Sequence, residues 1–355
     1  MSLRTGSQLG PYRLLRDFVA GANCRWTFAE RNGREFFIKE FQTPKHPPDA
    51  LPGPLHGARL IRCRAFEDRH RRLLAALRHA DAGATLVVPV EFFRHELAYY
   101  HVAPRVAPSA LSPRQIGSAR DRLLLIRALA GAVTALHKVR VVHGDLKPSN
   151  VLIDRAANGS LSPRLIDFDG AYFAGEAPEP DDMEFDQAFM APEVLGYVRQ
   201  SANGTGPRPG LAADIFSLGL LIHAFWAGCA PSPAGHQTYP AEAVASGDGL
   251  RLLTQDMDVA LEPLLRRALS ADPSERPAAR ELEVAAGIAL GRLGALAPAA
   301  SQAGFGPADP FSGARTPGRP RAEVSEGLAA LTATARSGSF GVVIRKSANL
   351  KRHEP

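Results

Sequence analysis

Hydrophobic positions in the first third of the chain follow the pattern of β-strands. Short apolar or aromatic runs are separated there by polar residues, as expected for strands with one buried face. The runs expected to form strands are 11–15, 26–29, 35–39, 86–93 and 97–102. Asn32-Gly33, between the second and third runs, is a hairpin turn signal. Residues 10–106 are therefore predicted to form a β-rich lobe.

One helix is expected to interrupt these strands. Residues 59–78 place Phe66, Leu73 and Leu77 on one face and many arginines on the other, which is helical periodicity. The proline-rich stretch 43–54 before it is predicted to be a loop.

From residue 107 onward the hydrophobic pattern becomes helical. Segment 120–138 carries Ile126, Leu129, Val133 and Leu136 at helical spacing. Segment 211–227 is apolar nearly all round, which indicates a buried helix. Two further helices are expected at 261–269 and 277–293. A β-rich lobe followed by a helical lobe over 107–292 predicts a bilobal α+β fold.

The last part of the chain has a different composition. Gly, Pro, Ala, Ser and Arg dominate residues 293–355, and such a segment cannot bury enough apolar surface to fold. A disordered tail is predicted, after one domain over 1–292. The tail contains a short apolar patch, 339–344, which is a candidate docking segment. Thr316 and the serines and threonines of 325–347 are candidate autophosphorylation sites.

Composition narrows the class of protein. With 355 residues, 45% hydrophobic and 22% charged, the chain can fill two packed lobes of a globular protein. No apolar run approaches the roughly 20 residues that span a bilayer, and the N-terminus has no apolar signal core. We therefore expect a cytoplasmic protein without a membrane partner.

Charge and cysteine usage exclude further classes. The net charge of +6 comes from 42 basic and 36 acidic residues, and from residue 295 onward eight basic residues face four acidic ones. Four of the six excess charges thus lie in the tail, which argues against a nucleic-acid-binding body. Cys24, Cys63 and Cys229 are too far apart to form a metal knuckle.

The residues with the clearest chemistry are clustered. The run His143–Asn150 places Asp145, Lys147 and Asn150 at i, i+2 and i+5, and Asp167 follows on a hydrophobic strand. A carboxylate can orient a hydroxyl and an ammonium can neutralise a phosphate, while Asn and Asp oxygens suit a hard metal ion.

This combination resembles the catalytic loop and metal-binding segment of protein kinases. The resemblance covers about residues 10–292 and extends to Ala191-Pro192-Glu193, to Asp214 through Gly219, and to Arg276 as the partner of Glu193. It implies a bacterial-type Ser/Thr protein kinase that transfers the γ-phosphoryl group of ATP with Mg²⁺ to a protein.

The resemblance also implies individual roles. Lys39 would contact the α- and β-phosphates and Asp145 would be the catalytic base. Lys147 is typical of Ser/Thr-specific members, and Asn150 and Asp167 would hold Mg²⁺.

Other nucleotide-binding positions follow the family less closely. Val19, Gly21 and Ala103 are assigned to the ATP site, although only the middle glycine of the family's glycine-rich loop is kept. The position of the helix glutamate that pairs with Lys39 falls on His70. We therefore expect Glu67, one turn earlier, to pair with Lys39; its alternative partners are the neighbouring arginines 64 and 71.

Three departures concern regulation. Gly144 stands where most relatives have the arginine that binds a phosphorylated loop, and 170–190 contains no Ser or Thr, with Tyr172 its only hydroxyl. Control by loop phosphorylation is therefore not expected. Asp186 replaces a threonine, where it would pair with Lys147 or repel the catalytic carboxylate. Asp169 replaces a glycine, which favours one conformer of the segment.

Two alternatives to an active protein kinase remain. The incomplete glycine loop is compatible with a pseudokinase that binds nucleotide without transfer. His143-Gly144-Asp145 also resembles aminoglycoside phosphotransferases, whose acceptors are small molecules. For the protein kinase, the acidic loop predicts a substrate that is basic around its acceptor.

Overall fold

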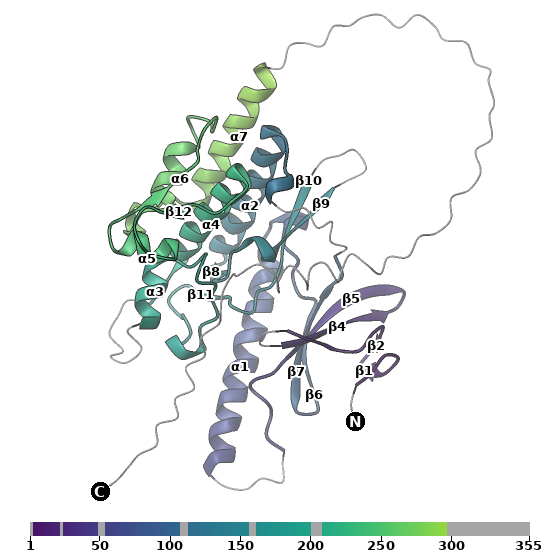
Figure 1. Cartoon of the computed structure of the whole chain (residues 1–355). Helices are drawn as coiled ribbons and strands as arrows, with labels where there is room; N and C mark the ends of the chain where they lie inside the picture. Colours follow the sequence, from purple (N-terminus) through teal and green to yellow (C-terminus); the bar gives the residue numbers. More distant parts are fainter. Residues whose placement is uncertain are drawn as a thin grey trace, which may run out of the picture.

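The computed structural model describes residues 3–21, 24–48, 54–106, 113–155, 161–199 and 208–296. Within these ranges a lobe of β-sheet and one long helix is followed by a helical lobe (Figure 1). The predicted bilobal α+β fold is confirmed. The proposed tail sites and the patch at 339–344 lie outside the described residues.

The small lobe is built on one antiparallel sheet. Its strands are β1 (Gln8–Leu9), β2 (Tyr12–Leu14), β3 (Val19–Ala20), β4 (Cys24–Arg31), β5 (Arg34–Phe41), β6 (Glu91–His95) and β7 (Ala98–Pro104). They lie in the order β1-β2-β4-β5-β7-β6, with β3 beside β4. The predicted turn joins β4 to β5, and its residues Asn32 and Gly33 have φ of 54° and 72°, as a tight hairpin turn requires.

Alternation along β5 orients the residue that matters most for the site. Ile38 is fully buried in the small-lobe core with Leu14 and Val102. Successive strand residues point to opposite faces, so Lys39 lies on the other face, opposite His101 of β7. The hydrophobic pattern of the strand thus directs Lys39 away from the core.

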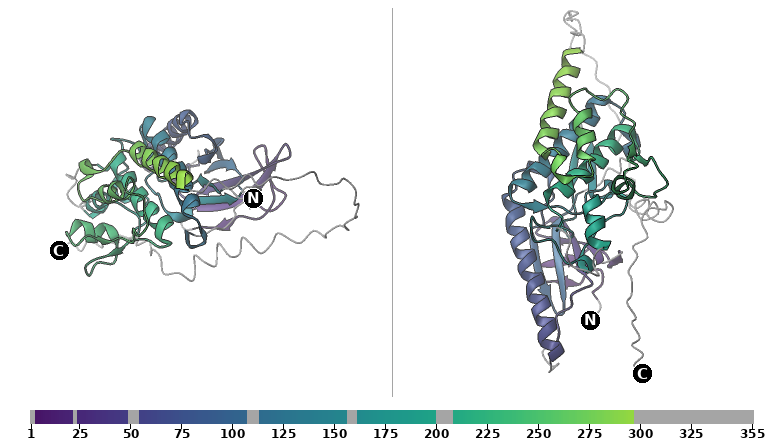
Figure 2. Two further views of the ribbon diagram at one scale, coloured as in Figure 1. Left: turned by 90° about the horizontal axis from the view of Figure 1, so that it is seen from above. Right: turned by 90° about the vertical axis from the view of Figure 1, so that its left-hand side faces the viewer.

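Helix α1 (Pro54–His79) is longer than its sequence pattern indicated. It starts five residues before the predicted 59 and ends one residue after 78. It runs beside the sheet and contacts β6, β8 and β11 (Figure 2). Cys63, His70, Leu73 and Leu77 are buried. The predicted strand 86–93 begins only at β6, because Leu86 instead forms a parallel bridge to the large lobe.

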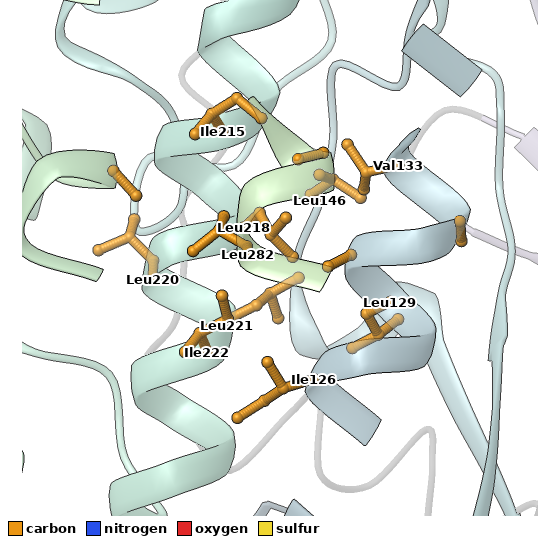
Figure 3. Packing of buried hydrophobic residues seen from close by; sticks show 14 of the residues in the cluster. Ile126, Leu129, Val133, Leu146, Ile215, Leu218, Leu220, Leu221, Ile222 and Leu282 are labelled. Atoms are coloured by element: carbon orange, nitrogen blue, oxygen red, sulfur yellow. The ribbon is translucent and has the colours of Figure 1, made fainter. Parts of the chain in front are cut away.

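The large lobe is helical. Its helices are α2 (Ala119–Lys138), α3 (Pro192–Arg199), α4 (Leu211–Ala227), α5 (Pro240–Ala245), α6 (Glu262–Ala268) and α7 (Ala279–Leu296). Every residue of α4 from 213 to 226 is buried, as its uniform hydrophobicity predicted. Side chains of α2, α4 and α7 meet in the core, and Leu146 lies among them (Figure 3).

Short strand pairs flank the two segments that carry the candidate site residues, 143–150 and 167–169. They are β8 (Val141–Val142) with β11 (Tyr172–Phe173), and β9 (Val151–Arg155) with β10 (Leu161–Leu165). A further pair, β12 (Ser232–Pro233) with β13 (Leu250–Arg251), lies in the large lobe. Single 3₁₀ turns occupy Gly83–Thr85, Pro113–Gln115, Pro148–Asn150, Pro180–Asp182 and Pro273–Glu275. None of the helices in the described ranges has the length and apolar character needed to cross a membrane.

Candidate active site

The loop between β8 and β9 is held by one buried carboxylate. Asp214, at the start of α4, is 1% exposed. Its Oδ2 accepts from the backbone amide of His143 at 2.8 Å, and its Oδ1 accepts from that of Gly144 at 3.0 Å. The Nε2 of His137 lies 3.0 Å from Oδ2. A buried carboxylate that binds two backbone amides fixes the path of the loop.

Two apolar residues orient the polar residues on either side of them. Leu146 is 2% exposed and packs in the large-lobe core, and Phe168 is 3% exposed in the same core. Asp145 and Lys147 flank Leu146, and Asp167 and Asp169 flank Phe168. Asp167 and Asp169 contact Lys39 of β5. Both segments are therefore anchored by a hydrophobic residue between two charged ones.

Asp145 has one oxygen engaged and one free. Its Oδ2 lies 2.7 Å from Lys147 Nζ and accepts from Asn150 Nδ2 at 3.0 Å. Its Oδ1 is buried without a hydrogen-bond partner among the described residues. Burial raises the pKa of this carboxyl, while Lys147 acts in the opposite direction. A buried oxygen that lacks a partner is ready to accept a hydrogen bond from a hydroxyl.

Lys39 reaches two carboxylates of the Asp167–Asp169 segment. Its Nζ lies 3.0 Å from Asp167 Oδ1 and 2.5 Å from Asp169 Oδ2. Burial alone would lower the pKa of Lys39, but Asp169 and Asp167 together hold it well above its usual value. The ammonium is therefore charged. Asp167 itself has φ of 65°, an unusual conformation for a residue other than glycine that clusters at functional sites.

The oxygen donors of the site suit Mg²⁺. The backbone N–H of Ile166 donates to the carbonyl of Asn150 at 2.9 Å. Because Asp167 follows Ile166 directly, this bond holds the segments of the two predicted metal ligands, Asn150 and Asp167, next to each other. Asn150 is 5% exposed and its amide nitrogen is bound to Asp145. In the described part of the chain no group of three or more His, Cys, Asp or Glu is placed to hold a metal. Mg²⁺ bound by one or two protein oxygens together with phosphates needs no such group.

Comparison with known proteins agrees with this geometry. The family model described as protein kinase domain matches residues 75–284. The chain belongs to the protein kinase family. It is 29% identical over 184 residues to the putative ribosomal protein S6 kinase alpha-1 of Caenorhabditis elegans, covering 48% of this chain and 21% of the relative.

Bacterial kinases are similar at the same level. The chain is 27% identical over 260 residues to the serine/threonine-protein kinase pkn2 of Myxococcus xanthus, covering 69% of this chain and 29% of the relative. It is 30% identical over 175 residues to the serine/threonine-protein kinase PknK of Mycobacterium tuberculosis (strain CDC 1551 / Oshkosh), covering 45% and 14%. The chain therefore spans less than a third of each of these relatives.

The expected pair between Glu67 and Lys39 is wrong. Glu67 Oε2 lies 2.8 Å from Arg71, one helical turn along α1, and its Oε1 accepts from the Tyr99 hydroxyl at 2.8 Å. This carboxylate is therefore engaged on the surface of its own helix and by β7. The alternative pairing with Arg71 is the one that the kinase adopts. Lys39 contacts Asp167 and Asp169 instead, and Asp169 was not predicted as its partner.

His70 stands at the position of the family's helix glutamate, but it is buried among aromatic rings and does not pair with Lys39. It is 2% exposed and its ring lies 4.2 Å from Phe66, 4.8 Å from Phe92 and 4.9 Å from His101, between ring centroids. Burial lowers its pKa well below the usual range, so the ring is neutral. An aromatic cluster replaces the charge that other kinases have here. The alternation Asp167-Phe168-Asp169 was the sequence signal that a second carboxylate faces Lys39.

The remaining nucleotide-site predictions fall on the small-lobe sheet. Gly21 donates its N–H to the Cys24 carbonyl at 2.8 Å, and a Cβ at Gly21 would lie 3.0 Å from the Cys24 sulfur. Val19 pairs with Trp26 across β3 and β4. Ala103 pairs with Phe37 across β7 and β5. A side chain at Gly21 would thus be crowded by the first residue of β4, and the roles of all three residues in nucleotide binding remain predictions.

Arginines on one side of α1 hold the loop 170–190, which corresponds to the activation loop of protein kinases. Arg69 donates to the carbonyl of Ala171 at 2.7 Å, and Arg72 pairs with Glu176 at 2.9 Å through both nitrogens. Arg62 pairs with Asp182 at 3.0 Å. We call these three residues the α1 arginine row. Lys147 lies 3.9 Å from Asp186, so that acid stands within salt-bridge distance, as one of the two sequence expectations proposed.

Gly144 is required by the backbone. Its φ is 78°, and a Cβ there would lie 2.6 Å from the carbonyl oxygen of Gly170 and 3.3 Å from the ring of Tyr172. An L-residue at this position would therefore be strained and would collide with the activation loop. Tyr172 is 2% exposed, and burial raises the pKa of its hydroxyl. The kinase has no room for the family's arginine in this conformation.

The Gly144→Ala variant is expected to lose at least about 2 kcal/mol of unfolding free energy, because strain and collision act together. Gly175→Ala is the matched control: Gly175 also has a positive φ, 94°, but a Cβ added there would meet no atom within 4 Å. It should lose about 1 kcal/mol. Urea denaturation of both variants measures the difference. Equal losses would show that Gly170 yields to the new side chain.

Proposed function

We propose that this protein kinase is catalytically active and transfers the γ-phosphoryl group of ATP to serine or threonine hydroxyls of a protein substrate. The observation that carries the proposal is the state of Asp145. One oxygen is fixed by Lys147 and Asn150, and the other is buried and without a partner among the described residues. This arrangement supports a carboxylate that orients an incoming hydroxyl.

The other residues then have defined tasks. Asp145 accepts the hydroxyl proton, and Lys147 beside it neutralises charge on the transferred phosphoryl group. Lys39 binds the α- and β-phosphates. Asn150 and Asp167 hold Mg²⁺, which supplies neutralisation of the phosphate oxygens when it is bound. Catalysis by this set is mainly positioning and electrostatic stabilisation.

The second candidate is a nucleotide-binding pseudokinase. It is favoured by the contact of Asp167 with Lys39, which engages a metal ligand, and by the single retained glycine, Gly21. A small-molecule phosphotransferase is less favoured, because Glu193 and Arg276 form the buried pair expected of a protein kinase. The Arg276 nitrogens lie 2.6 and 2.8 Å from the Glu193 oxygens.

A transfer assay separates these candidates. The purified kinase is incubated with γ-labelled ATP and Mg²⁺ and offered a basic protein, an acidic protein and a set of aminoglycosides, with Asp167→Asn as the inactive control. We expect label on serine and threonine of the basic protein. Nucleotide binding without label on any acceptor would support the pseudokinase, and label on aminoglycosides alone would support the small-molecule phosphotransferase.

Only some of the acidic residues in the loop 170–190 are available to a basic substrate, because others are already paired with arginines. Glu176 and Asp182 are paired with the α1 arginine row, and Glu179 is paired with Arg208 at 2.7 Å. Asp181 and Glu184 are exposed. We propose that Asp181 and Glu184 face basic side chains of the substrate.

Phosphorylation of the activation loop is not expected to regulate the kinase. The only side-chain hydroxyl in 170–190 belongs to Tyr172, which is buried. Two members of the α1 arginine row, Arg62 and Arg72, already pair with carboxylates of this loop. Treatment of the purified protein with a broad phosphatase, followed by its removal, should change the transfer rate by less than about twofold. A large loss would show that phosphorylation elsewhere, for instance among Thr316 and 325–347, controls activity.

A further inference from the structure

Lys39 has a second carboxylate that the family arrangement does not provide. Asp169 Oδ2 lies 2.5 Å from Lys39 Nζ, and its Oδ1 lies 3.3 Å from His101 Nδ1. Lys39 and His101 are direct neighbours across β5 and β7. One carboxylate therefore bridges two adjacent side chains of the sheet, and each of its oxygens has a partner.

The three side chains are shielded from water. Those of Lys39, Asp169 and His101 are 15%, 9% and 12% exposed. Ion pairs that are removed from water interact more strongly and are less screened than surface pairs. By contrast, the arginine that pairs with Glu67 is 62% exposed. The Asp169 pair is therefore the one able to hold the ammonium in place.

Asp167 cannot serve as the permanent partner of Lys39. It is the carboxylate proposed to bind Mg²⁺, and a carboxylate that coordinates a divalent cation is less available to an ammonium. Asp169 is directed at the same ammonium but lies two residues further on. It can remain paired with Lys39 whether or not Asp167 is engaged.

Helix α1 is linked to this pair by a different route. In protein kinases a glutamate of this helix pairs with the strand lysine. Here Arg69 of α1 donates to the backbone carbonyls of Asp169 at 3.3 Å and Ala171 at 2.7 Å. The helix thus positions the segment that carries the carboxylate, and the carboxylate positions the lysine.

We propose that Asp169 is the positioning residue for Lys39, that His101 orients its carboxylate, and that Arg69 transmits the position of α1 to it. The helix glutamate has been replaced by an acid from the metal-binding segment. The consequence for phosphate binding rests on the proposed kinase activity, but the pair itself does not.

The pair is tested without nucleotide by a double-mutant cycle. Melting temperatures are measured for Lys39→Met, Asp169→Asn and the double variant, and in parallel for Lys39→Met with Glu67→Gln. The shifts of the first cycle should depart from additivity by about 3 °C or more, and those of the Glu67 cycle should add within about 1 °C. Additive shifts at Asp169, or coupling at Glu67, would overturn the proposal.

A second variant covers the case in which Asp169→Asn does not fold. Asp169→Gly installs the family's own residue, and Glu67→Gln is its control. We expect Asp169→Gly to weaken ATP binding about tenfold or more, measured by calorimetry, and to lower kcat while the KM for the protein acceptor stays within twofold. Glu67→Gln should leave ATP affinity within about twofold. Unchanged or tighter ATP binding by Asp169→Gly would contradict the assignment.

The two proposals fail separately. Coupling between Lys39 and Asp169 in a protein that transfers no phosphate would leave the pair standing and remove the kinase activity. Full activity in Asp169→Gly, with additive melting shifts, would remove the pair and leave the activity standing.

Discussion

Asp145→Asn is expected to lower the rate of phosphoryl transfer by about 10³-fold. Asparagine keeps the shape of the side chain and one oxygen, but it cannot accept the proton of the substrate hydroxyl. It also removes the negative charge that lies 2.7 Å from the Lys147 ammonium. Initial rates of label transfer from ATP to a basic protein, at saturating concentrations of both substrates, measure the loss.

The control for this variant is Asp68→Asn. Asp68 lies on the exposed side of α1, where it pairs with Arg71 at 3.0 Å, and its loss should leave the rate unchanged within twofold. ATP affinity should be nearly the same in both variants, because Asp145 is assigned to the acceptor and not to the nucleotide. Transfer by Asp145→Asn at a tenth of the wild-type rate or more would remove Asp145 from its proposed role.

Glu193→Gln is expected to reduce the unfolding free energy by about 3–5 kcal/mol. The side chain of its partner Arg276 is 0% exposed, and it also donates to the carbonyls of Ala212 and Ser270 at 2.8 and 3.0 Å. Loss of the carboxylate charge leaves a buried guanidinium without a counter-ion. Urea denaturation followed by tryptophan fluorescence reports this change, because Trp226 is buried in α4.

An exposed pair provides the comparison for this prediction. Arg266 and Glu262 are one turn apart on α6, and the arginine side chain is 57% exposed. Arg266→Gln should cost at most about 0.5 kcal/mol, because water already solvates both charges. If Glu193→Gln cost no more than Arg266→Gln, the Glu193–Arg276 pair would contribute nothing specific to the stability of the large lobe.

The elements with a strong periodic pattern were predictable from sequence. The boundaries of α4 match the expected 211–227, and α2 begins one residue before the expected 120, because both helices are long and present a regular apolar surface. Helix α3 was missed because its eight residues are too few to establish a period. Helix α7 was expected, and it continues to residue 296, three beyond the predicted end.

In the site, too, the sequence predicts what the local chain determines and not what depends on the packing of distant elements. Asp145, Lys147 and Asn150 lie within six residues, so the chain itself limits their separation, and all three meet in the structure. The partner of Lys39 depends on how α1 is rotated against the sheet and on which neighbour a flexible carboxylate selects. Sequence spacing determines neither the rotation of the helix nor the choice of partner. In the structure Glu67 contacts Arg71 and Tyr99.

The lack of space for a Cβ at Gly144, beside the backbone of Gly170, also limits how this protein can evolve. Arginine is one base change away from every glycine codon, so the residue that related kinases use at this position is genetically near. A Cβ at this position would lie only 2.6 Å from the Gly170 carbonyl oxygen, which blocks that step unless the loop 170–190 first takes another path. To gain phosphorylation control, a lineage with this backbone must change both the segment of Gly144 and the loop 170–190. The contacts of the α1 arginine row stabilise the present position of that loop and so oppose the change.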